Sequence, residues 1–564
     1  MTHAHAPSQA ANVYDSHPAS DWWRGAVIYQ IYPRSYMDSN GDGVGDLPGI
    51  TAKLDHVASL GADAIWISPF FKSPMADFGY DVSDYRQVDP LFGTLADFDA
   101  LLARAHALGI KVIIDQVLSH TSDQHAWFVE SRSSRDNPRA DWYVWSDPLP
   151  DGSPPNNWVS VFGGSAWQWD ARRRQYYLHS FLTSQPDLNF HNPDVRAQQL
   201  AEVRFWCERG VDGFRFDACN HQFHDAALRS NPAAALQDQA GVSTVRPDNP
   251  YAMQKHLHDK SQPQNLDFLV ELRQVLDAFG AASVGEVGDE NAPPLMAEYT
   301  AAGRRLHMAY SFAMLTADGS AKRIRHECSL LDAALARTGG WGCWAFSNHD
   351  VVRVATRWAP AGSSASPAQV TMMQALLLSL RGSVSLYQGE ELGLPEADVP
   401  FELLQDPYGK AFWPEFKGRD GCRTPMPWAA AAPHAGFSSA QPWLPLGTGH
   451  AERAVDVQEA DPTSALHSAR RLLAWRRSQP LLVRGEQRFF DAPEPVLLFE
   501  RFDAAGHRLL VAVNLGAEPV QITLPPSWYG AQLCTDAPLQ GGAVGAAHSL
   551  SLHAHGVVFA KAGA

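Results

Sequence analysis

The chain is poor in cysteine, with six Cys spread over 564 residues and no C-x-x-C pair. Scattered cysteines of this kind do not build a disulfide framework, and they lack the paired spacing that holds structural zinc. The sequence therefore excludes a small disulfide-stapled domain and a zinc scaffold. The six positions are Cys207, Cys219, Cys328, Cys343, Cys422 and Cys534.

Long apolar runs and an excess of basic charge are also missing. No stretch reaches the roughly 18 apolar residues that a membrane span needs. The N-terminus has neither a basic region nor an apolar core of the signal-peptide kind, so we expect a cytoplasmic protein. Forty-five basic residues against 61 acidic ones give a formal charge of −16, which argues against nucleic acid or an anionic membrane as partner. A small-molecule substrate is expected instead, for a monomer or a small homo-oligomer.

What the sequence does contain is a long alternation of strand-like and helix-like segments. Short apolar runs alternate with stretches of helical periodicity, such as residues 50–60, 96–108 and 195–208. This alternation is typical of βαβ units and a parallel sheet, and eight such units predict a (β/α)₈ barrel. The sixth strand has the weakest pattern. The predicted strands cover residues 26–32, 63–67, 110–114, 211–216, 282–287, 307–312, 342–346 and 383–387.

Two breaks in the alternation predict further domains. Residues 121–190 are rich in Trp, Tyr, Pro, Asn and Gly and are too long for a structureless loop, so we expect an inserted domain there. From residue 484 the pattern becomes short alternating strands without helices, which predicts an antiparallel β-sandwich over 484–564. The barrel then takes residues 21–120 and 191–480, with a lid-like Pro/Trp-rich loop at 395–450. Residues 1–20 are expected to be a mobile tail.

One short stretch, Gly213-Phe214-Arg215-Phe216-Asp217, carries the strongest chemical hint. In a strand, residues two apart point to the same face, so Arg215 and Asp217 should lie side by side. A guanidinium beside a carboxylate lowers the carboxylate pKa and keeps it ionised, as a nucleophile requires. A purely structural ion pair is the alternative for this pair taken alone.

Polar motifs at the ends of five other predicted strands favour the catalytic interpretation, because barrel enzymes place their active residues there. Glu286 ends the strand next to that of Asp217, and neighbouring strands lie about 4.8 Å apart. Carboxyl groups about 5–5.5 Å apart suit a retaining glycosidase. Glu286 has no Arg next to it in sequence, so we expect a raised pKa and a role as proton donor. Asp350 would be a third carboxylate that binds sugar hydroxyls. The other motifs contain Asp77 and Tyr80, His120, His349, and Glu390 with Glu391.

Taken together, these motifs resemble the α-amylase superfamily of glycoside hydrolases, and within it the oligo-1,6-glucosidase and α-glucosidase branch. Gly213–Asp217 looks like the nucleophile motif, Val284-Gly285-Glu286 the acid/base motif, and Ser347–Asp350 the motif that stabilises the transition state. Residues 185–189 and 418–426 are similar to segments that mark the branch, and the resemblance runs from about residue 22 to residue 428. It implies a −1 subsite that holds the terminal glucose with Asp77, Tyr80, His120, Arg215, His349 and Arg419.

The residue after the nucleophile, Ala218, is expected to contact the +1 sugar. By resemblance, Val at this place accompanies α-1,6 preference and small residues accompany α-1,4 linkages, so maltose-type substrates are expected. A pocket closed by the inserted domain and the 395–450 loop implies exo action.

Two alternatives stay open. One is a glucosyltransferase or isomerase on the same scaffold, such as a sucrose isomerase, an amylosucrase or a trehalose synthase. The other is a non-catalytic binding relative, disfavoured because the three carboxylates are present.

A candidate metal loop lies at residues 38–46, where oxygen-bearing side chains alternate along the chain as a hard cation prefers. Position twelve is Gly49 and not Glu, which excludes an EF-hand, and a plain Asp/Asn/Gly turn is the alternative. The resemblance implies a structural Ca²⁺ or Mg²⁺ held by Asp38, Asn40, Asp42, the Val44 carbonyl and Asp46. Elsewhere Ser119 stands before His120, where the family more often has Asn, and this puts the superfamily's other calcium site in doubt.

Overall fold

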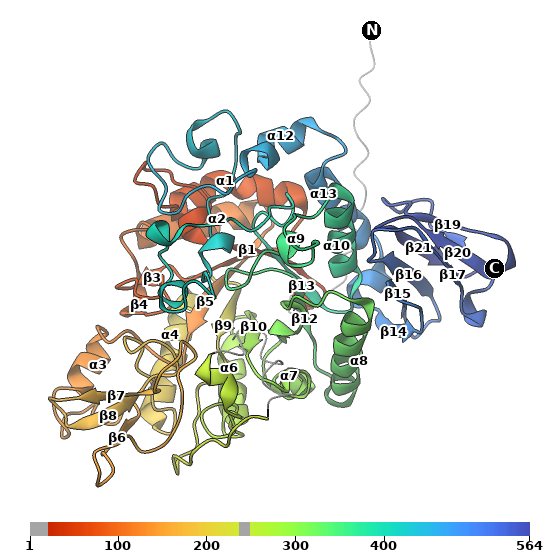
Figure 1. The fold of residues 1–564 in the computed structure, drawn as a ribbon. Coiled ribbons are helices and arrows are strands. Elements are labelled where there is room, and N and C mark those ends of the chain that lie inside the picture. The colour runs from red at the N-terminus through yellow and green to blue at the C-terminus, as the bar shows by residue number, and fades with distance from the viewer. Residues whose placement is uncertain (1–20, 236–248, 564) are drawn as a thin grey trace.

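A barrel of eight parallel strands forms the centre of the computed structural model, which describes residues 21–235 and 249–563 (Figure 1). Neighbouring strands follow the order β11-β10-β9-β5-β2-β1-β13-β12. A parallel bridge between Ala309 and Gly342 joins the two ends of this sheet, so the barrel is nearly closed. All eight predicted strands are confirmed, including the weak sixth. They are β1 (Val27–Ile31), β2 (Ala64–Ile67), β5 (Lys111–Val117), β9 (Gly213–Asp217), β10 (Ala282–Val287), β11 (Met308–Ser311), β12 (Cys343–Ala345) and β13 (Ser383–Tyr387).

Helices surround the barrel, and their ends follow from capping residues. The helix predicted from residue 50 begins earlier, because Asp46 accepts a hydrogen bond from the backbone of Gly49. Asn192 starts a helix two residues before the predicted Val195 in the same way. The predicted tail at residues 1–20 lies outside the described part of the chain. The surrounding helices are α1 (Leu47–Leu60), α2 (Leu95–Ala107), α4 (Pro193–Glu208), α6 (Asn265–Asp277), α7 (Ala292–Tyr299), α8 (Ala321–Thr338), α10 (Pro367–Ser379) and α13 (Ala465–Arg477).

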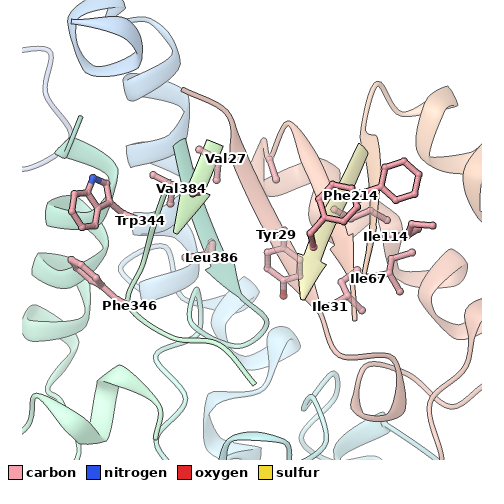
Figure 2. Packing of buried hydrophobic residues seen from close by; sticks show 14 of the residues in the cluster. Val27, Tyr29, Ile31, Ile67, Ile114, Phe214, Trp344, Phe346, Val384 and Leu386 are labelled. Carbon is pink, nitrogen blue, oxygen red and sulfur yellow. The ribbon is translucent and has the colours of Figure 1, made fainter. Parts of the chain in front are cut away.

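The strands are buried on both faces, as expected for a parallel barrel. Side chains such as Tyr29, Ile67 and Phe214 pack in the layer between strands and helices, and Figure 2 shows part of this cluster. Alternate residues, including Ile28 and Val284, fill the inside of the barrel. Among the described residues, no helix is long and apolar enough to cross a membrane.

The segment between β5 and α4 contains a small sheet of its own, seen at the lower left of Figure 1. Its strands follow the order β6-β8-β7, and a short helix precedes them. Trp158 stacks on Trp167 at 5.9 Å in a small separate core, whereas Trp169 is 40% exposed. A bridge from His120 to Asp187 ties this segment to the residues that follow β5, and a bridge from Tyr143 to Leu188 joins two parts of the segment itself. Its elements are α3 (Ala126–Ser131), β6 (Trp145–Ser146), β7 (Trp167–Asp170) and β8 (Gln175–Leu178).

Two antiparallel sheets form the C-terminal part, which confirms the predicted fold of that region. One has the order β14-β15-β16-β21-β18 and the other β17-β20-β19. The buried Arg501 fixes this part to the barrel, since it donates to the carbonyls of Ser379, Leu482 and Gly485. The strands are β14 (Glu486–Phe490), β15 (Val496–Phe502), β16 (Arg508–Asn514), β17 (Val520–Thr523), β18 (Gln532–Leu533), β19 (Gly542–Val544), β20 (Ser549–Leu552) and β21 (Val557–Lys561).

Candidate active site

A cavity of about 210 Å³ lies at the carboxyl ends of the barrel strands. The segment inserted after β5 contributes Phe162 and Phe181 to its wall, and the 395–450 loop contributes Tyr408 and Phe416. Most of the predicted site residues meet here. Those lining the cavity are Asp77, Tyr80, His120, Asp217, Ala218, Glu286, Asp350 and Arg419, while Arg215 and His349 are buried and bond to them.

Arg215 contacts two of the candidate catalytic carboxylates. Its Nη1 lies 2.6 Å from Asp217 Oδ1, and its Nη2 lies 2.7 Å from Glu286 Oε1. No Arg stands next to Glu286 in sequence, but Arg215 contacts it in the fold, because β9 and β10 are adjacent and share this guanidinium. The backbone N–H of Ala218 also donates to Glu286 Oε2 over 3.1 Å. The two carboxylates thus flank a single cationic group.

Burial, and not the absence of a cation, sets the acidity of this pair. It raises the pKa of Asp217 to about 7, against the opposing effect of Arg215. The expectation that Arg215 keeps the pKa of Asp217 low is therefore wrong. Burial also raises the pKa of Glu286 to about 7, as predicted. Both carboxyl groups therefore titrate near neutrality, and the charge of Asp217 further raises the pKa of Glu286, so the two groups lose their protons in successive steps.

We expect a bell-shaped pH dependence of kcat/KM with its maximum near neutrality. As the pH rises through about 7, Glu286 loses the proton that its predicted role as proton donor requires. As the pH falls below that range, Asp217 gains a proton and no longer carries a negative charge. The two limbs of the profile report the two ionisations in the free enzyme. Initial rates from acid to alkaline pH check this, and a rate that keeps rising above neutrality would contradict it.

Asp350 is held ionised by a different set of partners. Its Oδ1 accepts from Arg423 at 3.0 Å and Arg419 at 3.3 Å, and its Oδ2 lies 3.2 Å from His349. Burial disfavours its charge, but the two arginines, and His349 in the acid range where its ring is protonated, outweigh burial and hold the pKa of Asp350 well below its usual range. The third carboxylate is therefore a fixed negative charge.

Neutral histidines and a tyrosine form the wall beneath the carboxylates. Tyr80 stacks on His349 at 5.5 Å, and its hydroxyl lies 2.6 Å from His349 Nε2. Burial lowers the pKa of His349 to about 3 and that of His120 to about 4, so both rings are neutral at pH 7. The hydroxyl of Ser119 lies 3.0 Å from His120 Nδ1. His120 and Tyr80 thereby present fixed polar edges to the cavity.

An ion pair between two predicted residues lies in the lining of the cavity. Arg419 Nη2 donates to Asp77 Oδ1 over 2.8 Å, and Gln185 donates to the other oxygen of Asp77. Gln185 belongs to the branch-marking segment but had no role predicted from sequence. Ala218 also lines the cavity and has a positive φ of 40°, which turns the chain sharply after Asp217.

Several residues that complete the site were not predicted. The carboxylate of Asp115 accepts hydrogen bonds from Arg215, Tyr80 and Trp66. It therefore helps to fix the position of the Arg215 guanidinium. Tyr310 donates to Glu286 Oε1 over 3.0 Å and lies on the sixth strand, whose sequence pattern is the weakest. Arg423 falls inside a quoted motif without an assigned role. The position of Asp115 at a strand end was the one available hint for it.

The candidate metal loop is a tight turn outside the cavity. Asp38 accepts from the backbone of Asn40, Gly41 and Gly43 and from Ser438. Burial opposes its charge, but these bonds outweigh burial and lower the pKa of Asp38. Asp46 accepts a hydrogen bond from the backbone N–H of Ser39 and caps the start of α1. The side chains of Asn40 and Asp42 each accept a hydrogen bond from the backbone N–H of the residue two positions later. Over the described residues, no group of three or more acidic, His or Cys side chains is arranged to hold a metal ion.

Comparisons with known proteins agree with this geometry. A family model described as the alpha amylase catalytic domain matches residues 30–485. The chain is 58% identical over 510 residues to a probable alpha-glucosidase of Rhizobium meliloti (strain 1021), covering 90% of this chain and 92% of that protein. It is 37% identical over 542 residues to an oligo-1,6-glucosidase of Heyndrickxia coagulans, with 90% and 94% covered.

Two solved structures extend the likeness to three dimensions. The alpha-glucosyl transfer enzyme XgtA is 59% identical with a TM-score of 0.93, covering 96% of this chain and 99% of that one. The trehalulose synthase MutB from Pseudomonas mesoacidophila MX-45 is 32% identical with a TM-score of 0.84, at 96% and 99% coverage. On the family match, the curated relatives and the shared fold, the chain is a glycoside hydrolase of the α-amylase family.

Proposed function

We propose that the enzyme is a retaining, exo-acting α-glucosidase that removes one glucose from the non-reducing end of short α-glucosides. One observation carries this proposal: a single guanidinium, Arg215, contacts both Asp217 and Glu286. Shared contact with one guanidinium, together with the bond from Ala218 N to Glu286, favours the short carboxyl separation of about 5–5.5 Å that suits a covalent intermediate.

In the first step, Asp217 attacks C1 of the terminal glucose as the glycosidic bond breaks, and Glu286 donates its proton to the leaving oxygen. This leaves a β-glucosyl ester on Asp217. In the second step, a water molecule gives its proton to Glu286 and attacks C1, the ester bond breaks, and α-glucose leaves. Asp350, permanently charged, would accept hydrogen bonds from sugar hydroxyls that tighten as positive charge develops at C1.

The ion pair between Asp77 and Arg419 supports exo action. It lies in the lining of the cavity, where in the proposed function it would stand against the −1 sugar and leave room for a terminal glucose alone. The small side chain of Ala218 on the acceptor side favours α-1,4 bonds of the maltose type. Transfer of the glucosyl group to a sugar is the second candidate activity, favoured by the 59% identity to a structure named as an alpha-glucosyl transfer enzyme.

The direct test is turnover of maltose, isomaltose, sucrose and trehalose side by side, with product identification. We expect maltose to be the best of the four and free glucose to be the main product at low substrate concentration. Ala218→Val serves as the matched variant, because its added bulk should shift preference from maltose toward isomaltose. Isomerised disaccharide or polymer as the main product would overturn hydrolysis in favour of transfer.

We also propose that the loop of Asp38, Asn40, Asp42, the Val44 carbonyl and Asp46 holds a structural Ca²⁺ or Mg²⁺. The donor set contains only oxygen, as hard cations prefer, and a cation would offset the charge of three nearby carboxylates. Removing the metal with a chelator should then lower Tm, and restoring it should reverse the loss. Asp42→Ala is the control in which the chelator should have no effect. Metal analysis that finds no ion after purification in Ca²⁺ and Mg²⁺ would reject the site.

A further inference from the structure

The buried carboxylate of Asp406, outside the cavity, accepts hydrogen bonds from Arg419, which lines the cavity. Asp406 begins the short helix α11 (Pro407–Ala411) in the 395–450 loop and is fully buried. Its Oδ2 accepts from Arg419 Nε at 3.1 Å, and its Oδ1 accepts from Arg419 Nη2 at 2.8 Å. This is the two-pronged pairing that fixes both the position and the plane of a guanidinium.

The remaining donors of the same guanidinium point to the cavity. Nη2 also donates to Asp77 at 2.8 Å, and Nη1 donates to Asp350 at 3.3 Å. Without its hydrogen bonds to Asp406, the guanidinium of Arg419 could turn its Nε–Nη2 edge to Asp77 and form the two-pronged pair with that carboxylate. The contact with Asp350 would then be lost, because the two edges of a guanidinium point in different directions.

Two glycines allow the carboxylate to come this close. Asp406 Oδ2 also accepts from the backbone N–H of Arg419 at 2.7 Å. Gly418, just before it, has φ +78°, and a Cβ there would lie 2.7 Å from Asp406 Oδ2. A Cβ on Gly409 would lie 2.6 Å from the carbonyl oxygen of Lys417. The chain crosses itself here with no room for side chains, so the pairing is built into the loop.

We infer that Asp406 is a positioning residue for the glycosidase reaction: it orients Arg419 so that this arginine holds Asp77 and Asp350 in place around the −1 sugar. The inference rests on the proposed function, in which these three groups form the closed end of the substrate pocket. Asp406 itself lies outside the lining of the cavity and touches no substrate. Burial opposes its charge, but Arg419 outweighs burial and lowers the pKa of Asp406 to about 2, so the grip persists at every working pH.

A purely local role is the competing explanation, because Asp406 Oδ1 also caps α11 by accepting from Tyr408 N at 3.2 Å. The two roles differ in how a substitution behaves once Arg419 is gone. A cap would matter equally with or without Arg419, whereas a positioning residue would have nothing left to position. A double-mutant cycle measures this difference.

The experiment compares Asp406→Asn, Arg419→Ala and the double variant with wild type. Asn keeps the size but turns an N–H toward one prong of Arg419. We expect Asp406→Asn to lower kcat/KM for maltose about 10- to 100-fold. We also expect it to raise the Ki of glucose, a competitive ligand of the −1 pocket, about 10-fold. In the Arg419→Ala background the same change should cost less than about 3-fold. Asp398→Asn is the matched control, since Asp398 lies on the same loop, is 78% exposed and pairs with Lys417.

Each failure has its own meaning. An equal loss of kcat/KM with and without Arg419, or an unchanged Ki of glucose in Asp406→Asn, would overturn the positioning role alone. A wild-type kcat/KM in Arg419→Ala would instead overturn the proposed −1 pocket, and the positioning role with it. Circular dichroism and Tm first establish that the variants fold. If Asp406→Asn does not fold, Asp406→Glu and Gly418→Ala take its place, because each displaces the carboxylate of residue 406. The same two measurements apply to them: the loss of kcat/KM with and without Arg419, and the Ki of glucose.

Discussion

We expect Asp217→Asn to lower kcat for maltose by at least about three orders of magnitude while the fold remains intact. The amide keeps the size of the carboxylate and can still accept from Arg215, but it cannot form the ester bond to C1. Turnover by wild type and variant at neutral pH, with circular dichroism as the check on folding, measures this. Activity within about 10-fold of wild type would contradict the assignment of the nucleophile.

A second readout separates a lost nucleophile from general damage. In Asp217→Gly the vacated space should admit azide, which would attack C1 on the face that Asp217 normally uses and give β-glucosyl azide.

The wild-type folded state retains a proton on Asp217 between about pH 4 and about pH 7 that the unfolded chain has lost, so this group's contribution to stability falls as the pH rises. The Tm difference, Asp217→Asn minus wild type, should therefore be larger at about pH 8 than at about pH 5.

The barrel and the positions of the three candidate carboxylates were predictable because their signals are local in sequence. A buried strand needs only a run of apolar residues, and the residue after it is placed at the barrel rim by the topology. Asp217 and Glu286 lie at the ends of such runs and Asp350 follows one, so the eight-strand prediction brought them together. The face shared by Arg215 and Asp217 follows from the two-residue period alone, and their bond of 2.6 Å bears this out.

Other parts of the site depend on partners that sequence spacing does not identify. Glu286 meets Arg215 across 71 positions only because β9 and β10 are neighbours, and a motif does not state which strands pair. Asp406 sits in an irregular loop without periodicity, and its role depends on a chain crossing at Gly409 and Gly418. The pKa of Asp217 was predicted with the wrong sign because burial, a property of the whole fold, outweighs its one neighbouring cation.

Glu286→Gln should lower kcat for maltose by about 10²- to 10⁴-fold, the usual contribution of a positioned proton donor and acceptor. The amide oxygen of the variant can still accept the hydrogen bond from the backbone N–H of Ala218, and Tyr310 remains beside it. The amide has no acidic proton, however, to give to the leaving oxygen. The loss should be far smaller for the first step on an aryl α-glucoside with an acidic leaving group, which departs without protonation. Comparing maltose with 2,4-dinitrophenyl α-glucoside in single-turnover experiments checks this.

The second step distinguishes Glu286 from a residue that only shapes the pocket. With the aryl substrate the glucosyl ester on Asp217 should accumulate, because no base remains to activate water. Azide needs no base, so it should restore turnover and give α-glucosyl azide, the opposite anomer to that expected from Asp217→Gly. The alkaline limb of the pH profile should also disappear, since it reports the proton on Glu286. If both substrates lose activity equally and azide rescues neither, Glu286 is not the acid and base, and the two-carboxylate mechanism fails with it.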